Sequence, residues 1–518
     1  VVSALSQTGG IYLTESDGVT IGVVSVSVIE FQADGSLIVV TDAEQSGFTV
    51  GGDGDLILAL AMGDFTLDAA IELGGSLLIE AMSGSVTVGA MINSDNGHIT
   101  IRAAEDILLT AEADLKTALP GTVSLDAESG VLTLNGMAQI TADGSAVRLR
   151  AQDDITLGSV TATAVSIDSD GGAIVKGAET GVNVRAQVLR LQADGGIGAS
   201  LRHLDIEVDI VTALSAAGGI YLTEVDGASV DDVGVTVIEL VADGATRVVT
   251  DALQSDLTTG AGGNIILVAA LGDITLEDGL DEASPGKAVT ADGSGSVRIE
   301  ALSGSVTVNA DIGSQTGHVT IRAFDNLDLS TGVEINTATA GTASLDAGSG
   351  ALTMSGTARV TALDSAVRLR AEADIVLGEV TAADVSLVAP GGAILNAAGA
   401  TMNVTAIRLR LQAEGEIGAA GRHLSTDVDR VTALSRTGGI YLTESDGVTV
   451  EDVTVTVTEL NADGGLTVVV DAVQSDLRGG VDGSIVLVAL EGDIVLADGT
   501  EAGNLGEVVA AGGGVRIA

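Results

Sequence analysis

Carboxylates are the most abundant side chains in this chain that could do chemistry. The sequence has 72 Asp and Glu residues against 22 Lys and Arg residues, a formal net charge of −50. Many carboxylates stand in acid–glycine turns, and such turns stacked on one another could bind calcium, which prefers several oxygen ligands. The segment Gly51–Asp55 approaches a calcium-binding nonapeptide, but Leu56 stands where the second ligand is needed. Solvated turns with diffuse counterions are therefore the favoured interpretation, and calcium is the alternative. The candidate calcium ligands are Asp53, Asp55, Asp170 and Asp194.

A second set of charged residues forms a column of alternating sign. If short strands stack in register, the last outward position of successive strands places opposite charges about 4.8 Å apart. Each exposed pair contributes only about 0–1 kcal/mol. We therefore interpret the column as a structural ladder that specifies register, with a binding patch as the alternative. The ladder consists of Glu80, Arg102, Asp126, Arg150 and Asp168, and then of Glu300, Arg322, Asp346 and Arg370.

The remaining reactive side chains do not indicate an enzyme. The four histidines lack a second histidine or an acid at metal-ligand spacing, so we expect structural roles for them. The absence of cysteine excludes a thiol nucleophile, a disulfide scaffold and a Cys-rich zinc site. Most features occur at least twice, whereas catalysis needs one asymmetric site. We predict no catalytic residue and no required cofactor. The histidines are His98, His203, His318 and His423.

The chain repeats itself at two scales. The segment Thr8–Glu15 returns as Ala217–Glu224 and as Thr437–Glu444, and the tyrosines in these segments lie 209 and 220 residues apart. Within each long repeat a shorter unit recurs about every 18–26 residues, which gives about 22 units in the chain. We expect one continuous solenoid. The predicted boundaries are 1–209 for the first long repeat, 210–429 for the second and 430–518 for a partial third.

The short units predict strands, because apolar residues occupy every second position in segments such as Gly97–Ala103 and Gly121–Ala127. No segment sustains a helical period. One coil buries about six aliphatic side chains, a gain of about 10–15 kcal/mol. Ordering its residues costs about 20–40 kcal/mol of backbone entropy, so a coil needs neighbours on both sides. The sequence therefore predicts an all-β fold, a parallel β-helix (β-solenoid). About 22 coils at about 4.8 Å per coil predict a rod of about 105 Å.

Composition excludes several classes of partner. The large negative charge argues against nucleic acid and anionic lipid. The sequence contains no stretch of eighteen consecutive apolar residues, so we predict no membrane-spanning segment. Hydrophobic residues are 46% of the chain, which argues against a disordered acidic tail.

The short repeat resembles a known family. Ala146–Gly158 and Gly262–Leu276 are similar to the repeats of filamentous haemagglutinin-like exoproteins. Gly219–Gly227 resembles segments of giant repetitive surface proteins of Gram-negative bacteria. The resemblance covers nearly the whole chain. It implies a secreted, right-handed β-helical rod that mediates adhesion or cell contact, and no catalytic or ligand-binding residue is carried over from it.

We therefore expect the structural shaft of a secreted bacterial adhesin or surface fibre, a stiff acidic spacer located outside the cell or on its surface. The alternative is a self-assembling filament or sheath subunit that stacks end to end. A glycan-binding or glycan-cleaving β-helix is a third hypothesis. The expected partners are further segments of the same long chain or other copies, and a host or neighbouring-cell surface.

Overall fold

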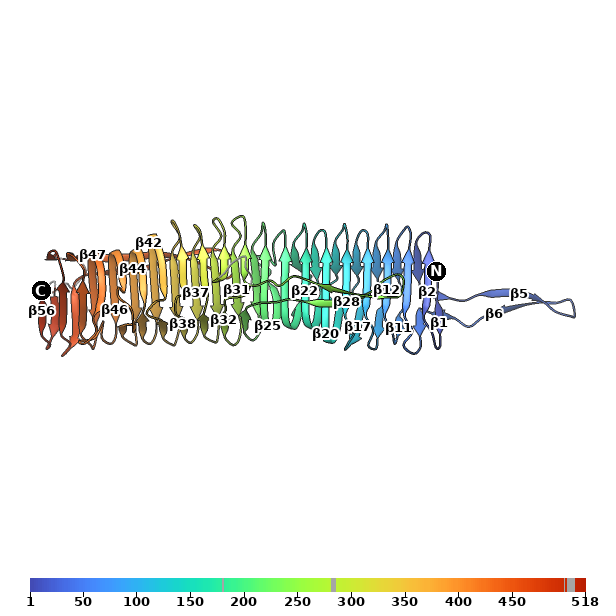
Figure 1. Cartoon of the computed structure of the whole chain (residues 1–518), viewed down its shortest axis with the longest axis horizontal. Coiled ribbons are helices and arrows are strands. Elements are labelled where there is room, and N and C mark those ends of the chain that lie inside the picture. Colours follow the sequence, from blue (N-terminus) through green and yellow to red (C-terminus); the bar gives the residue numbers. More distant parts are fainter. Residues whose placement is uncertain (179–180, 281–285, 498, 501–507) are drawn as a thin grey trace. The chain divides into compact units, whose positions relative to one another are not determined.

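The computed structural model of the chain describes residues 1–178, 181–280, 286–497, 499–500 and 508–518. Its regular structure is β-strand throughout the described residues, and none of them forms a helix that could cross a membrane. The chain forms two compact units, Val1–Ile210 with Val233–Gln254 and Val211–Asp232 with Ser255–Ala518. In each unit short strands stack in parallel on three ladders (Figure 1), which confirms the predicted parallel β-helix.

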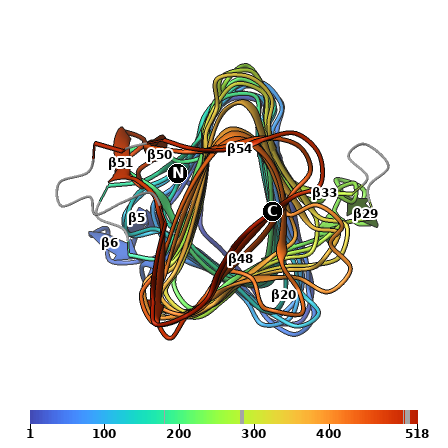
Figure 2. The same ribbon diagram turned by 90° about the vertical axis from the view of Figure 1, so that its left-hand side faces the viewer.

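Three parallel ladders build the first unit, one for each side of the coil. Figure 2 looks along the stacked coils and shows their three-sided outline. Ladder 1 consists of β2 (Ile11–Glu15), β9 (Leu56–Leu60), β12 (Leu77–Ala81), β15 (Ile99–Ala103), β18 (Val123–Ala127) and the C-terminal parts of β20 (Gln139–Ala151), β22 (Ser159–Ser169) and β24 (Val184–Ala193). Ladder 2 consists of β3 (Val19–Ile21), β10 (Phe65–Leu67), β13 (Val86–Val88), β16 (Ile107–Leu109), β19 (Leu132–Leu134), β21 (Ile155–Leu157) and β23 (Ile174–Lys176). Ladder 3 consists of β1 (Ala4–Ser6), β8 (Phe48–Val50), β11 (Ile71–Leu73), β14 (Met91–Ser94), β17 (Asp114–Ala118) and the N-terminal parts of β20, β22 and β24.

The second unit has the same three ladders. Ladder 1 consists of β26 (Ile220–Glu224), β31 (Ile265–Ala269), β34 (Val297–Ala301), β37 (Val319–Ala323), β40 (Ala343–Ala347) and the C-terminal parts of β42 (Arg359–Ala371), β44 (Glu379–Ala389) and β46 (Val404–Ala413). Ladder 2 consists of β27 (Ala228–Val230), β32 (Ile274–Leu276), β35 (Val306–Val308), β38 (Leu327–Leu329), β41 (Leu352–Met354), β43 (Ile375–Leu377) and β45 (Ile394–Asn396). Ladder 3 consists of β30 (Leu257–Thr259), β33 (Lys287–Ala291), β36 (Asp311–Ser314), β39 (Glu334–Thr337) and the N-terminal parts of β42, β44 and β46.

Stacked aliphatic side chains fill the interior of each coil. In ladder 1 of the first unit one inward position is aliphatic in five successive strands, and all five side chains are fully buried. Full burial of such a side chain contributes about 1.5–3 kcal/mol. Because each residue stacks on its equivalent one coil away, the period-2 pattern of the sequence directly gives the core. The five residues are Ile79, Ile101, Leu125, Leu149 and Ile167.

The ladders change partners where the partial third repeat begins in the second unit. The long strand β47 (Leu424–Ser435) continues ladder 3 with its first half and ladder 1 with its second half. β48 (Ile440–Glu444) and then β53 (Ile485–Ala489) stack on the first half, whereas β52 (Leu477–Val481) stacks on the second half. By sequence, β53 is the equivalent of β31 in ladder 1, and β52 is the equivalent of β30 in ladder 3. The long repeat is therefore not a whole number of coils.

Antiparallel hairpins interrupt the coils at equivalent points of the three repeats. They are formed by β5 (Ser27–Phe31) with β6 (Leu37–Thr41), by β28 (Thr236–Leu240) with β29 (Thr246–Thr250), and by β50 (Val453–Leu460) with β51 (Leu466–Gln474). A further short antiparallel pair, β4 (Val23–Val24) with β7 (Gln45–Ser46), flanks the first hairpin on its two sides in the sequence. The sequence interpretation as uninterrupted coils missed these insertions.

Candidate functional site

The structure brings the charged ladder into register as expected. Glu80, Arg102, Asp126, Arg150 and Asp168 are successive Cα partners in the first unit. Glu300, Arg322, Asp346 and Arg370 are successive partners in the second unit. Arg150 Nη1 lies 3.2 Å from Asp126 Oδ1, and Arg370 Nη1 lies 3.0 Å from Asp346 Oδ1. Arg322 Nη2 lies 3.9 Å from Asp346 Oδ2, and these three pairs are coil-to-coil ion pairs of the kind that alternating charge predicts.

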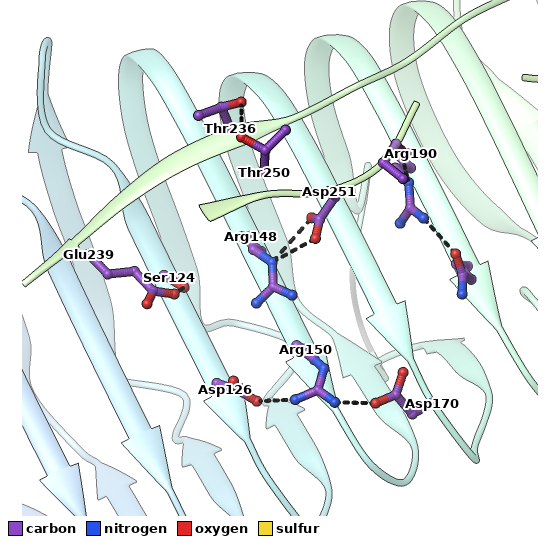
Figure 3. A network of polar contacts seen from close by, with 12 residues as sticks. Ser124, Asp126, Arg148, Arg150, Asp170, Arg190, Thr236, Glu239, Thr250 and Asp251 are labelled. Atoms are coloured by element: carbon purple, nitrogen blue, oxygen red, sulfur yellow. Dashed lines mark hydrogen bonds and ion pairs between the residues drawn. The ribbon is translucent and has the colours of Figure 1, made fainter. Parts of the chain in front are cut away.

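Other ladder residues find partners outside the column. Arg150 also pairs with Asp170, one of the calcium candidates, rather than with its register partner Asp168 (Figure 3). Burial raises the pKa of the Asp168 carboxyl, and the charge of Arg190 opposes this shift. Arg102 pairs with Glu239 on β28, and Arg322 lies 3.8 Å from Glu459 on β50. Residues of the ladder therefore form ion pairs with the hairpins as well as with neighbouring coils.

In the first unit β28 lies across the outward face of ladder 1, over β15, β18 and β20. The Thr122 hydroxyl donates to the Ile238 carbonyl at 2.6 Å and accepts from the Ile238 amide at 3.0 Å. The Leu240 amide donates to Thr100 Oγ1 at 3.0 Å. Figure 3 shows Glu239 beside Ser124, whose hydroxyl donates to Glu239 Oε1 at 2.8 Å. We call the outward face formed by Thr100, Arg102, Thr122, Ser124 and Arg148 the seat of this hairpin.

The base of the hairpin is held by two arginines and a glutamine. Arg148 Nε donates to both carboxylate oxygens of Asp251, at 2.9 and 3.2 Å (Figure 3). Arg190 Nε donates to the Ala252 carbonyl at 3.1 Å. Gln254 Nε2 donates to the Leu191 carbonyl at 3.0 Å. The hairpin and its base thus bind side chains from β15 to β24.

The second unit repeats this seat with equivalent residues. Thr342 Oγ1 donates to the Thr458 carbonyl at 2.6 Å and accepts from the Thr458 amide at 3.0 Å. Ser344 Oγ donates to Glu459 Oε1 at 2.7 Å, and the Leu460 amide donates to Thr320 Oγ1 at 3.0 Å. The contacts at the base recur as well: Arg368 with Asp471, Arg410 with the Ala472 carbonyl and Gln474 with the Leu411 carbonyl.

Glu239 is the electrostatic centre of the first seat. Its side chain is buried, and it accepts from Arg102, from Ser124 and from Arg247 Nη2 at 2.6 Å. A buried carboxylate is costly unless opposite charges and hydrogen bonds surround it. The two arginines and the serine meet this requirement, so the position is specific for an acidic residue.

Two of the four histidines contact the threonines of the seats, an arrangement that the sequence did not reveal. His98 Nδ1 accepts from the Thr122 amide at 3.2 Å, and His318 Nδ1 accepts from the Thr342 amide at 3.1 Å. Burial lowers the pKa of both imidazoles, and in His98 the charge of Asp55 opposes this shift. Neutral imidazoles therefore orient the two threonines that bind the hairpins.

The calcium candidates do not form a cluster. Asp55 Oδ1 accepts from the Ser76 amide at 2.8 Å, and Asp170 is paired with Arg150. Asp53 lines a polar groove of about 370 Å³ together with Glu72 and Asp95. Among the described residues, one group of at least three possible metal ligands has its ligand atoms within 4.8 Å of one another, and it contains none of the four candidates. That group is Asp427, Glu444 and Asp446. Calcium binding stays a prediction.

Comparisons of this chain with models of known families, with curated proteins and with solved structures gave no match. Sequence reasoning named Arg102 and Arg322 as ladder residues, and it missed the other residues of the seats and the hairpins. A signal for the hairpins is present, since Asp34-Gly35, Asp243-Gly244 and Asp463-Gly464 each separate two alternating apolar segments. The three glycines have φ of +84°, +82° and +79°, as such turns require.

Proposed function

We propose that this chain is the structural shaft of a secreted bacterial adhesin or surface fibre, a stiff acidic spacer at the cell surface. The observation that carries the proposal is the hairpin on its seat. Each seated hairpin lies across several coils of one unit and binds side chains from most of them. Bending or separating those coils must break these contacts together, as a mechanical element requires.

The charge distribution supports the same role. With a net charge of −50, neighbouring shafts repel each other, which keeps them soluble and apart. The resemblance of the short repeats to filamentous haemagglutinin-like exoproteins supports a location outside the cell. No catalytic residue or resident cofactor belongs to the proposal.

Small-angle X-ray scattering of the full chain tests the shaft. A compact globular chain of this length has a radius of gyration of about 24 Å. A rod of about 105 Å has a radius of gyration of about 30 Å, given a rise of about 4.8 Å per coil. We expect the larger value and a scattering profile typical of a rod, unchanged between dilute and concentrated samples. A radius near that of a globular protein contradicts a shaft.

The alternative function is a subunit of a self-assembling filament. One observation favours it, the exposed apolar surface of the first hairpin, β5–β6. Electron microscopy that shows particle length increasing with concentration would support the filament over a shaft that acts as a single chain.

A further inference from the structure

The hairpin β50–β51 is fixed on its seat by the main chain of one of its two strands. Thr342 binds both the amide and the carbonyl of Thr458, and the Leu460 carbonyl accepts from Arg298 Nη1 at 2.6 Å. These backbone groups all belong to β50. Within the described residues β51 pairs with β50 and with no other strand. The edge of β51 that faces away from β50 is therefore open.

The register of the hairpin determines which backbone groups lie on this open edge. The Asn461 amide donates to the Gly465 carbonyl at 2.7 Å, so these two residues form a hydrogen-bonded pair. Hydrogen-bonded and non-hydrogen-bonded pairs alternate along an antiparallel ladder. Residues of the non-hydrogen-bonded pairs direct their amides and carbonyls outward, which is how Thr458 and Leu460 of β50 reach the seat. Their counterparts on β51 are Leu466, Val468 and Val470.

The side chains of these three residues are apolar and exposed. Leu466 is 58% exposed, Val468 is 62% exposed and Val470 is 58% exposed. The segment Leu466–Val470 contains no charged residue and no proline, with which natural edge strands prevent pairing. The equivalent strand β29 carries Thr246, Arg247 and Thr250 instead. An open, uncharged edge with exposed apolar side chains can accept a further strand.

The charge around β51 indicates the kind of strand that fits. Residues 453–474 include Glu459, Asp463 and Asp471 but no lysine or arginine. Asp463, beside the turn, is exposed. A second copy of this chain also carries a net charge of −50 and is repelled, whereas a basic segment is attracted. Charge complementarity therefore favours a basic partner.

We propose that β51 binds an extended, basic segment of another polypeptide as an added β-strand. The backbone groups of Leu466, Val468 and Val470 form hydrogen bonds with the segment, and its alternate apolar side chains cover those of the three residues. Lysine or arginine on either side of the apolar residues faces the acidic surface. The seat holds the hairpin in place, so the edge is ordered before the partner binds. This inference does not depend on the shaft function.

Binding of a synthetic peptide to the full chain tests the proposal. The peptide alternates valine and threonine between terminal lysines. The control peptide has the same charge, but proline replaces its central valine, which removes a backbone donor from the strand. By fluorescence anisotropy we expect the alternating peptide to bind about tenfold or more tightly than the control. Binding should weaken as NaCl is raised from about 10 to about 150 mM.

Matched substitutions in the full chain locate the site. Val468→Lys places a charge on the open edge, and we expect it to weaken binding of the alternating peptide about tenfold or more. Val39→Lys and Val248→Lys add the same charge at the equivalent positions of the other two hairpins, which are 68% and 66% exposed, and we expect no change. Circular dichroism with a cooperative thermal transition establishes that each variant is folded. Val470→Lys is a second variant at the same edge if Val468→Lys does not fold.

Three results would overturn the proposal. Equal binding of the two peptides would show that only net charge is recognised. Unchanged binding by the folded edge variants, or equal weakening by Val39→Lys or Val248→Lys, would place the site elsewhere. Self-association of the native chain in sedimentation velocity experiments that Val468→Lys abolishes would assign the edge to a second copy. The scattering test of the shaft does not bear on the peptide measurements.

Discussion

At the scale of single residues, the hairpins depend on two threonine hydroxyls. Thr122 and Thr342 each donate to a hairpin carbonyl and accept from the amide of the same residue. One hydroxyl thus binds both the amide and the carbonyl of one residue, on the side of the hairpin strand that has no β-partner. Valine has the same shape without either function, so the loss cannot be compensated locally.

We predict that Thr342→Val loosens the hairpin of the second unit. It leaves the Thr458 amide and carbonyl without their partner, which costs about 1–3 kcal/mol. Hydrogen exchange should show faster exchange at Thr458 and its neighbours in β50. Thr353→Val is the control, because Thr353 occupies the middle of β41 in ladder 2 and faces outward away from any hairpin. Equal exchange in the two variants would contradict the assigned role.

The histidine pair predicts a pH effect at the same contacts. Burial lowers the pKa of His98 and His318 below the ordinary value of 6.5, so the folded state favours the neutral ring. A depressed pKa contributes stability above the unfolded value, and this contribution is lost as the pH falls below 6.5. Protonation of Nδ1 also places a ring N–H against the N–H of the threonine amide, so the hydrogen bond between these two atoms is lost. Hairpin amides should therefore exchange faster as the pH falls below 6.5, after correction for intrinsic exchange.

The control for this effect is the double variant His98→Asn and His318→Asn. Asparagine can accept from the threonine amide but does not titrate in this range. We expect the corrected exchange of β28 and β50 to become independent of pH between 6.5 and 5. A pH dependence that persists in the double variant would assign the effect to other groups.

At the scale of elements, close approach of the backbone at the corners limits the side chains that a coil can accept. A Cβ on Gly317 would lie 2.1 Å from the Gly295 carbonyl oxygen of the preceding coil. A Cβ on Gly313, four residues earlier in β36, would have no atom within 4 Å. Gly317 is therefore required because a Cβ would clash with the preceding coil, whereas a Cβ at Gly313 would meet no other atom.

We predict opposite effects of alanine at these two positions. Gly317→Ala forces the two backbones apart and should destabilise the chain by about 2 kcal/mol or more. Gly313→Ala should be neutral or stabilise by about 0.4–1 kcal/mol, because it reduces the entropy of the unfolded chain in a strand conformation that alanine accepts. Urea denaturation of the two variants measures the difference, and equal stabilities would contradict the packing described here.

The coils were predicted from the sequence and the hairpins were missed, for a physical reason. Stacking on an equivalent strand makes Ile79, Ile101 and Leu125 alike, so the pattern is repeated in the sequence. The strands β28 and β29 have the same length and alternation as coil strands, so periodicity did not separate them. Arg102 and Arg150 occupy one column, yet Arg102 binds Glu239, 137 residues away, a contact that no local spacing reveals.

At the scale of the whole molecule, the surplus of negative charge opposes folding through self-repulsion. At low ionic strength the Debye length is about 30 Å, and at physiological ionic strength it is about 8 Å. We predict that the thermal midpoint rises when NaCl is raised from about 10 to about 150 mM. A midpoint that falls would mean that the ion pairs of the ladder outweigh the repulsion.

The same measurement distinguishes the two interpretations of the acid–glycine turns. Diffuse counterions predict equal effects of CaCl2 and MgCl2 at the same ionic strength. Specific calcium sites predict a larger rise with CaCl2, which a chelator reverses.

The exchange of ladders at β47 determines how repeated surfaces are presented to the outside. In the second unit β31 and its equivalent β53 stack on different ladders. The sequence motif that they share therefore lies on a different side of the coil one long repeat later. Within this unit, a straight partner laid along one ladder would meet the motif at β31 or at β53, but not at both. A partner that binds both copies has to cross from one side of the coils to another.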